Sequence, residues 1–115
     1  MTFNVSGDTL NGILNQRSQD MLTANNWNVC QYAVLMHMMA KCSGLKAGEL
    51  VHVIADAHIY DRHIPIVEEI IAGQTHDAPT LTIDDIDDFY KFTPSSFHLE
   101  NYKYNEFNHK IPVAV

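Results

Sequence analysis

Three side chains with useful chemistry lie within four positions of the stretch NQRSQD, residues 15–20. The guanidinium of Arg17 offers a fork of charged donors and the hydroxyl of Ser18 adds another, a combination suited to a phosphate or other small anion. The alternative is an ion pair between Arg17 and Asp20 at the end of a strand. The segment by itself leaves both interpretations open.

A carboxamide, Asn28, lies near the start of the apolar stretch WNVCQYAVLMHMMAKC, residues 27–42. A buried amide is costly unless it is hydrogen-bonded. One interpretation is that Asn28 caps the start of a helix. The other is that it reads a ligand, because a carboxamide presents a donor and an acceptor side by side and matches the imide edge of a uracil ring.

Polar groups also recur at alternate positions near the end of ELVHVIADAHIY, residues 49–60. Asp56, His58 and Tyr60 share one face of the expected strand, where they can bind a sugar hydroxyl, with Asp56 fixing the histidine tautomer. A fully hydrogen-bonded polar edge of a sheet is the alternative. A metal site that adds Asp61 and His63 is not expected, because the spacing of the two histidines fits no standard ligand pattern.

Alternating and apolar runs predict the strands that carry these groups, and cap and stop residues around apolar stretches predict the helices. Strands are expected at residues 1–7, 10–18 and 49–60, with shorter candidates at 80–83 and 96–102. Helices are expected at 27–42, capped by Asn25 or Asn26 and ended by Gly44, and at 65–72. In the strand at 49–60, the face expected to point to the core carries Val51, Val53, Ala55, Ala57 and Ile59.

The helix expected at 27–42 is apolar on nearly every side, which is typical of a buried helix. One chain of 115 residues has little material to surround it. The native core is therefore expected to be larger than this chain, through further sequence or a partner subunit.

Composition narrows the classes of protein to consider. A length of 115 residues favours one domain, and a net charge of −7 argues against non-specific nucleic-acid binding. Cys30 and Cys42 lack metal-type spacing and are interpreted as reduced core thiols. The acidic run at residues 84–88 is interpreted as a solvated face. The sequence has no signal peptide and no apolar run of membrane-spanning length, so no membrane association and a cytoplasmic location are expected.

Taken together, these segments resemble the thymidylate synthase family. The resemblance rests on QRSQD, on the long stretch NNWNVCQYAVLMHMMAKCSGLKAGELVHVIADAHIY and on the terminal IPVAV. The family has a Gln-Arg-Ser-x-Asp segment, a Phe-Asn pair that opens a long buried helix, a strand that ends in Asp-x-His-(Leu/Ile)-Tyr, and an apolar C-terminus. Order and spacing agree from Phe3 to Val115, with Trp27 in place of the usual phenylalanine.

The resemblance implies a role for each polar group in binding deoxyuridylate (dUMP). Arg17 and Ser18 match the family's contacts to the phosphate. Asn28 matches the asparagine that reads the uracil edge. His58 and Tyr60 match the pair that holds the 3′-hydroxyl of the sugar.

The resemblance also implies the folate site, the fold and the assembly. Asp20 matches the aspartate that meets the pterin ring of 5,10-methylenetetrahydrofolate, the co-substrate, and Val115 matches the C-terminal residue that closes over the folate. No metal is implied. The implied fold is α+β, a mixed β-sheet packed with one long buried helix and a shorter second helix. Residues 1–115 correspond to the C-terminal part of such a domain, which forms a homodimer in the family.

No catalytic residue is identified, because the family's nucleophilic cysteine belongs to a Pro-Cys-His segment that would precede Met1. Cys30 and Cys42 are expected inside the helix and cannot replace it. The implied function is therefore a portion of the methyltransferase that makes thymidylate (dTMP), inactive alone. The alternatives are a non-catalytic dUMP-binding or assembly module and a deoxycytidylate hydroxymethylase. Asn28 speaks against the last, in which an aspartate is expected.

Overall fold

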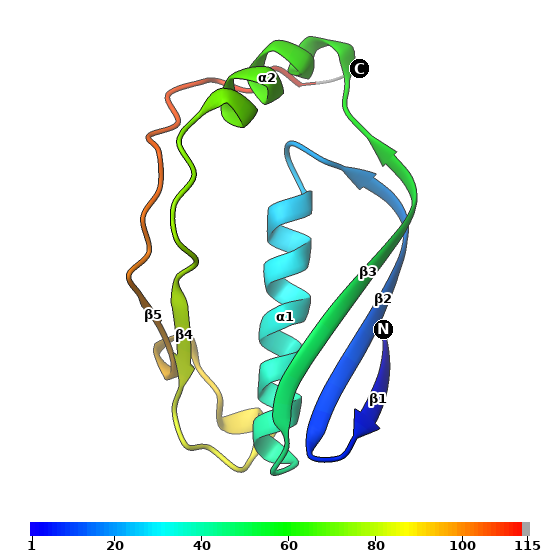
Figure 1. Ribbon diagram of the computed structural model, residues 1–115, viewed down its shortest axis with the longest axis vertical. Coiled ribbons are helices and arrows are strands. Elements are labelled where there is room, and N and C mark those ends of the chain that lie inside the picture. The colour runs from blue at the N-terminus through cyan, green and yellow to red at the C-terminus, as the bar shows by residue number, and fades with distance from the viewer. Residues whose placement is uncertain (114–115) are drawn as a thin grey trace. The chain divides into compact units, whose positions relative to one another are not determined.

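The computed structural model describes residues 1–113, which form two compact units (Figure 1). The first unit consists of Met1–His58 and Asp85–Phe92. The second consists of Ile59–Asp84 and the chain from Thr93 onward. Strands and helices occur in both, and the expected α+β class with a mixed sheet, one long helix and a shorter second helix is confirmed.

The first unit is built on a three-stranded sheet with the order β1-β2-β3, formed by Thr2–Ser6, Thr9–Asp20 and Lys46–His58. β1 and β2 form an antiparallel hairpin in which Ser6 faces Thr9, and Gly7 in the connecting turn has φ of 61°. Such positive φ values favour glycine in tight hairpin turns. β2 and β3 are parallel, so the sheet is mixed and the connection between them needs a crossover.

That crossover is helix α1, Asn25–Cys42, which begins two residues before the expected start. Its N-cap is Ala24 and no side chain caps it, so the expected cap by Asn25 or Asn26 is wrong. Its end agrees with expectation, because Gly44 follows with φ of 66°. Lys46, the first residue of β3, pairs with Asp8 at 2.7 Å, and the lysine lowers the pKa of that carboxyl group.

The core of the first unit lies between one side of α1 and the sheet. Leu10, Met36 and Ala40 form its buried centre, and Leu50 packs against them from β3. The face of β3 that meets the helix is therefore the one with Leu50, and the expected assignment of the core face to Val51 and its neighbours is wrong for this chain. The Val51 face is the more uniformly apolar of the two, but α1 packs against the face whose apolar residues include Leu50.

The other sides of α1 and of the sheet are open within the described residues. Only Met36 and Ala40 of α1 are buried, so the helix is covered on one side rather than all round. Trp27 is 80% exposed. Cys30 is exposed and Cys42 half-buried, so the thiols are free as expected but Cys30 is not a core residue. The expectation of a core larger than this chain stays a prediction.

The second unit contains α2, Ile64–Ala72, preceded by the short helix η1, Asp61–His63. Strands β4, Thr80–Ile83, and β5, Phe97–Glu100, pair antiparallel with Leu81 opposite Leu99. The short helix η3, Pro94–Ser96, directly precedes β5. None of the helices within residues 1–113 is both long and apolar enough to cross a membrane.

The acidic run at 84–88 is shared between the units and is more structured than a plain solvated face. In the first unit Asp85 pairs with Lys41 at 2.9 Å, which lowers the pKa of the aspartate although its side chain is 98% exposed. Asp88 accepts a hydrogen bond from the backbone of Tyr90 and caps the short helix η2, Phe89–Lys91. In the second unit Asp84 pairs with His98.

Candidate functional site

The parallel register of β2 and β3 brings the polar groups of two distant segments together. Ser18 lies opposite Asp56, and Asp20 lies opposite His58. Figure 1 shows the two strands side by side and running in the same direction, so their carboxyl ends meet at one end of the sheet. Ligands of sheets with parallel strands commonly bind at such an end. The sequence identified these groups, and the register makes them neighbours.

Asp56 connects the group expected to bind phosphate with one expected to bind the sugar. The hydroxyl of Ser18 donates a hydrogen bond to Oδ2 of Asp56 at 3.3 Å, across 38 residues of sequence. The same Oδ2 lies 3.6 Å from Nδ1 of His58. At that distance the carboxylate faces the histidine ring from beyond hydrogen-bond range.

Arg17 lies on the opposite face of β2 from Ser18, because successive side chains of a strand alternate. It is exposed, and the structure of residues 1–113 contains no ion pair between it and Asp20, so that alternative is not realised. β1 pairs with β2 only as far as Ile13, and no strand of the described chain covers the same edge of β2 beyond it. Arg17 and Ser18 are thus neighbours in sequence that project from opposite faces of β2, and the Ser18 hydroxyl is engaged on the side of β3.

Asp20 organises the turn between β2 and α1. Its Oδ1 accepts hydrogen bonds from the backbone N–H groups of Leu22 and Thr23, both at 3.0 Å, and its Oδ2 accepts one from the Thr23 hydroxyl at 2.6 Å. These bonds satisfy donors of the turn before the helix, whereas the first N–H groups of α1 itself have no side-chain cap. The expected contact of Asp20 with the folate stays a prediction.

Asn28, in the first turn of α1, is held by a chain of side chains from the sheet. Nε2 of Gln16 donates to Oδ1 of Asn28 and to the backbone carbonyl of Ser18, both at 3.1 Å. Oε1 of Gln16 lies 2.9 Å from Nε2 of His52. Sequence reasoning assigned no role to Gln16 or His52. Strand alternation could have pointed to them, because Gln16 shares a face of β2 with Ser18 and His52 shares a face of β3 with Asp56.

Tyr60 and Val115, also expected in the site, do not belong to the described part of the first unit. Tyr60 belongs to the second unit and is 42% exposed, with its ring against that of His63 in a T-shaped contact at 5.5 Å. Val115 lies outside the described residues. The carbonyl groups of Pro112 and Val113 are held by His63 at 2.8 Å and Arg62 at 2.9 Å. The second unit therefore fixes the chain just before its last residues.

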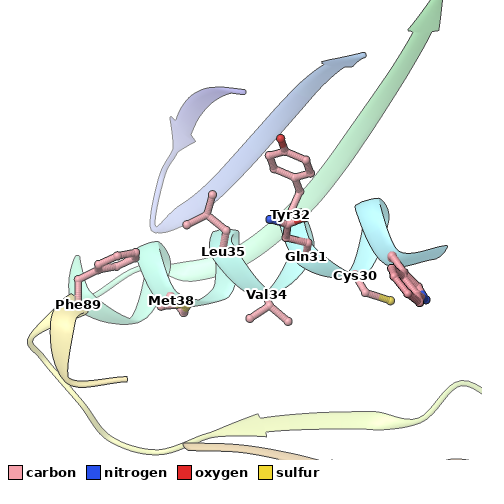
Figure 2. Close-up of a pocket in the computed structure, with 8 residues that line it drawn as sticks. Cys30, Gln31, Tyr32, Val34, Leu35, Met38 and Phe89 are labelled. Carbon is pink, nitrogen blue, oxygen red and sulfur yellow. The ribbon is translucent and has the colours of Figure 1, made fainter. Parts of the chain in front are cut away.

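An apolar pocket of about 580 Å³ lies along α1, separate from these polar groups. Figure 2 shows Cys30 and Val34 on the side of the helix turned away from β2 and β3, with Phe89 near the C-terminal end of the helix. The pocket offers few polar groups for a nucleotide, and it contains none of the expected site residues. No group of three or more potential metal ligands is present among residues 1–113.

Comparisons with known proteins agree on one family. The family model described as thymidylate synthase matches residues 1–115. The thymidylate synthase of Oenococcus oeni is 37% identical over 101 residues, which cover 87% of this chain and 31% of the relative. That of Clostridium beijerinckii is 39% identical over 107 residues, covering 90% and 41%. The solved structure of thermostable thymidylate synthase A from Bacillus subtilis has a TM-score of 0.91 at 35% identity, covering 96% of this chain and 40% of that one. The chain thus spans about a third to two fifths of the length of these relatives.

Replacing Asp20 with alanine should loosen the turn before α1. Three hydrogen bonds are lost, so we expect the free energy of unfolding to fall by about 1–3 kcal/mol. Hydrogen exchange at the amides of Leu22 and Thr23 should accelerate more than exchange in β2. The matched variant Thr23→Val removes only the hydroxyl and should cost less. Equal, unchanged exchange in both variants would show that Asp20 does not hold this turn.

Proposed function

Because this chain belongs to the thymidylate synthase family, we propose that it supplies part of the nucleotide and folate site of a thymidylate synthase. The reaction proposed for the whole enzyme is the reductive methylation of dUMP to dTMP, in which 5,10-methylenetetrahydrofolate gives both the carbon and the hydride. The proposal rests chiefly on the parallel register that sets Ser18 beside Asp56 and Asp20 beside His58, inside a family match over the whole chain. Its substrates are small and water-soluble, and we propose a cytoplasmic location.

The phosphate and the sugar of dUMP are assigned to the carboxyl ends of β2 and β3. Arg17 and Ser18, near the end of β2, are proposed to bind the phosphate, the arginine by charge and the serine by its hydroxyl. On binding, the Ser18 hydroxyl exchanges Asp56 for a phosphate oxygen. His58 and Tyr60 are proposed to hold the 3′-hydroxyl, with the carboxylate of Asp56 lying 3.6 Å from Nδ1 of His58.

The base and the folate are assigned to groups around the start of α1. Asn28 is proposed to read the uracil edge. Asp20 is proposed to meet the pterin ring and Val115 to close over the folate. The carboxylate of Asp20 is already engaged with the turn that leads into α1, so a folate contact at Asp20 links ligand binding to the entry of the helix that carries Asn28.

The nucleophile is proposed to come from sequence outside these 115 residues. A thiolate that adds to the pyrimidine splits one difficult step into easier ones, and it has to lie against the ring. Cys30 lines the apolar pocket on α1, and the Cys42 thiol lies 3.9 Å from the carbonyl of Ile86. Neither thiol contacts a residue assigned to dUMP, so this chain by itself is proposed to be inactive.

Activity of the purified chain tests this proposal. With dUMP and methylenetetrahydrofolate in excess, the chain alone should form no dihydrofolate in an absorbance assay. Adding a separately expressed polypeptide that carries a Pro-Cys-His segment and the rest of the fold should restore formation. Steady turnover by the chain alone, abolished by Cys30→Ser or Cys42→Ser, would contradict the proposed division of the site. Binding of dUMP without restored turnover would favour the non-catalytic module instead.

A homodimer is proposed across the open face of the sheet. Ile13, Val51 and Val53 lie on the face turned away from α1 and are 42%, 49% and 48% exposed. Contiguous exposed apolar side chains of this kind mark protein interfaces, and a flat sheet face suits a symmetric pair.

Light scattering should therefore find the mass of two chains at micromolar concentration. Val51→Lys places a charge in the proposed interface and should shift the protein to monomer. Ile71→Lys, at a residue of α2 that is 76% exposed, should leave the mass unchanged. A stable monomer before any substitution would contradict the proposed dimer.

Replacing Asn28 with aspartate should shift the base preference from uracil to cytosine. The carboxylate loses the amide donor and gains an acceptor for the exocyclic amine, and each mismatched buried group costs about 1–3 kcal/mol. We expect the affinity ratio of dUMP to deoxycytidylate to fall by about ten- to a hundredfold. Calorimetric titration with both nucleotides measures it, with Asn26→Asp as the matched control. An unchanged ratio would remove Asn28 from the base site.

A further inference from the structure

We propose that His52, acting through Gln16, is a positioning residue that fixes which way the carboxamide of Asn28 faces a ligand, and thereby determines which base is accepted. The inference rests on the proposed function, because it concerns the base site of the same nucleotide. It assigns a role to two residues that touch no ligand themselves.

A free asparagine cannot distinguish uracil from cytosine. Uracil presents a carbonyl acceptor at C4 and an N–H donor at N3, whereas cytosine presents an amine donor at C4 and an acceptor at N3. A carboxamide carries one donor group and one acceptor group, and rotating it by half a turn exchanges them. Discrimination therefore requires something behind Asn28 that prevents this rotation.

The backbone carbonyl of Ser18 supplies a fixed reference for the direction of the hydrogen bonds. A carbonyl oxygen only accepts, so the Gln16 atom 3.1 Å from it must be the amide nitrogen. That nitrogen also lies 3.1 Å from Asn28, whose facing atom must then be its oxygen. Turning Asn28 over would set two donor groups against each other.

His52 completes the chain from the other side. With its nitrogen committed to Ser18 and Asn28, Gln16 presents Oε1 to His52 at 2.9 Å, and Nε2 of the histidine must donate. The Nε2–H group is present in both the cation and one neutral tautomer. Without this donor, a partly buried carbonyl of Gln16 loses its partner, and Gln16 has less to hold it against rotation.

The orientation that results is the one that fits uracil. Oδ1 of Asn28 accepts from Gln16 and keeps a second lone pair for the N3–H group, while Nδ2 of Asn28 supplies donors for the C4 carbonyl. Cytosine would meet donor against donor and acceptor against acceptor. Base selection in this arrangement depends on His52, which lies on β3 and not on the helix that carries Asn28.

Binding of dUMP and deoxycytidylate to His52→Phe, measured by calorimetry on the 115-residue chain, tests the inference. This variant keeps a ring and removes the donor, and we expect the affinity ratio to fall by about ten- to a hundredfold, with cytosine gaining. His52→Gln returns an amide donor at a similar reach and should restore most of the ratio. His37→Phe, a histidine of α1 outside the hydrogen-bond chain, should leave the ratio unchanged. A wild-type ratio in His52→Phe, or an equal loss for both nucleotides, would overturn the inference.

Nitrogen-15 NMR of the ligand-free chain separates this inference from the proposed function. His52 should carry its proton on Nε2, and the side-chain amide signals of Asn28 should move in His52→Phe. A wild-type protein with the proton on Nδ1 alone, or unmoved Asn28 signals in the variant, overturns the positioning role. Wild-type protein that binds neither nucleotide contradicts the proposed function, and the NMR result then decides whether His52 positions Asn28.

Discussion

The parallel pairing of β2 with β3 is the constraint on which the candidate site depends. The pairing joins segments 38 residues apart at Ser18 and Asp56, and the same register sets Asp20 against His58. A slip of one residue would turn every side chain of one strand to the other face. The contact of Ser18 with Asp56 would then be lost, and Gln16 would no longer lie between His52 and Asn28. The buried contacts of Leu10 and Leu50 with α1 oppose such a slip, since it would expose them.

The elements could be predicted from the sequence more reliably than their surroundings. Alternation located β1, β2 and β3, and the apolar stretch that ends before Gly44 located α1, because both signals are local. The helix cap was wrong because α1 begins at Asn25, so both asparagines lie inside its first turn, and Asp20 holds the turn before the helix instead. The core face of β3 was wrong because α1 packs against the face that carries Leu50 together with His52 and Asp56, and the strand's own pattern does not contain the position of α1.

The kinds of chemical group in the candidate site were also readable from the sequence, but their partners were not. The residue types and spacing indicated two residues that could bind an anion, a carboxamide that could recognise a base, and a polar strand end. Only the family resemblance named a ligand. The roles of Gln16 and His52 depend on which residues of β2 and β3 lie side by side, and no local pattern contains that information. No local pattern predicts the free edge of β2 either. That edge is free because β1 pairs with β2 only as far as Ile13.

The central claim is that the carboxyl ends of β2 and β3, with the start of α1, bind the nucleotide. The most direct measurement is an NMR titration of the isotope-labelled chain with dUMP. The account predicts that the signals of Arg17, Ser18, Asn28 and His58 move together along one saturating curve. Movement confined to residues around the apolar pocket of α1, such as Val34 and Met38, or no movement at millimolar dUMP, would contradict it.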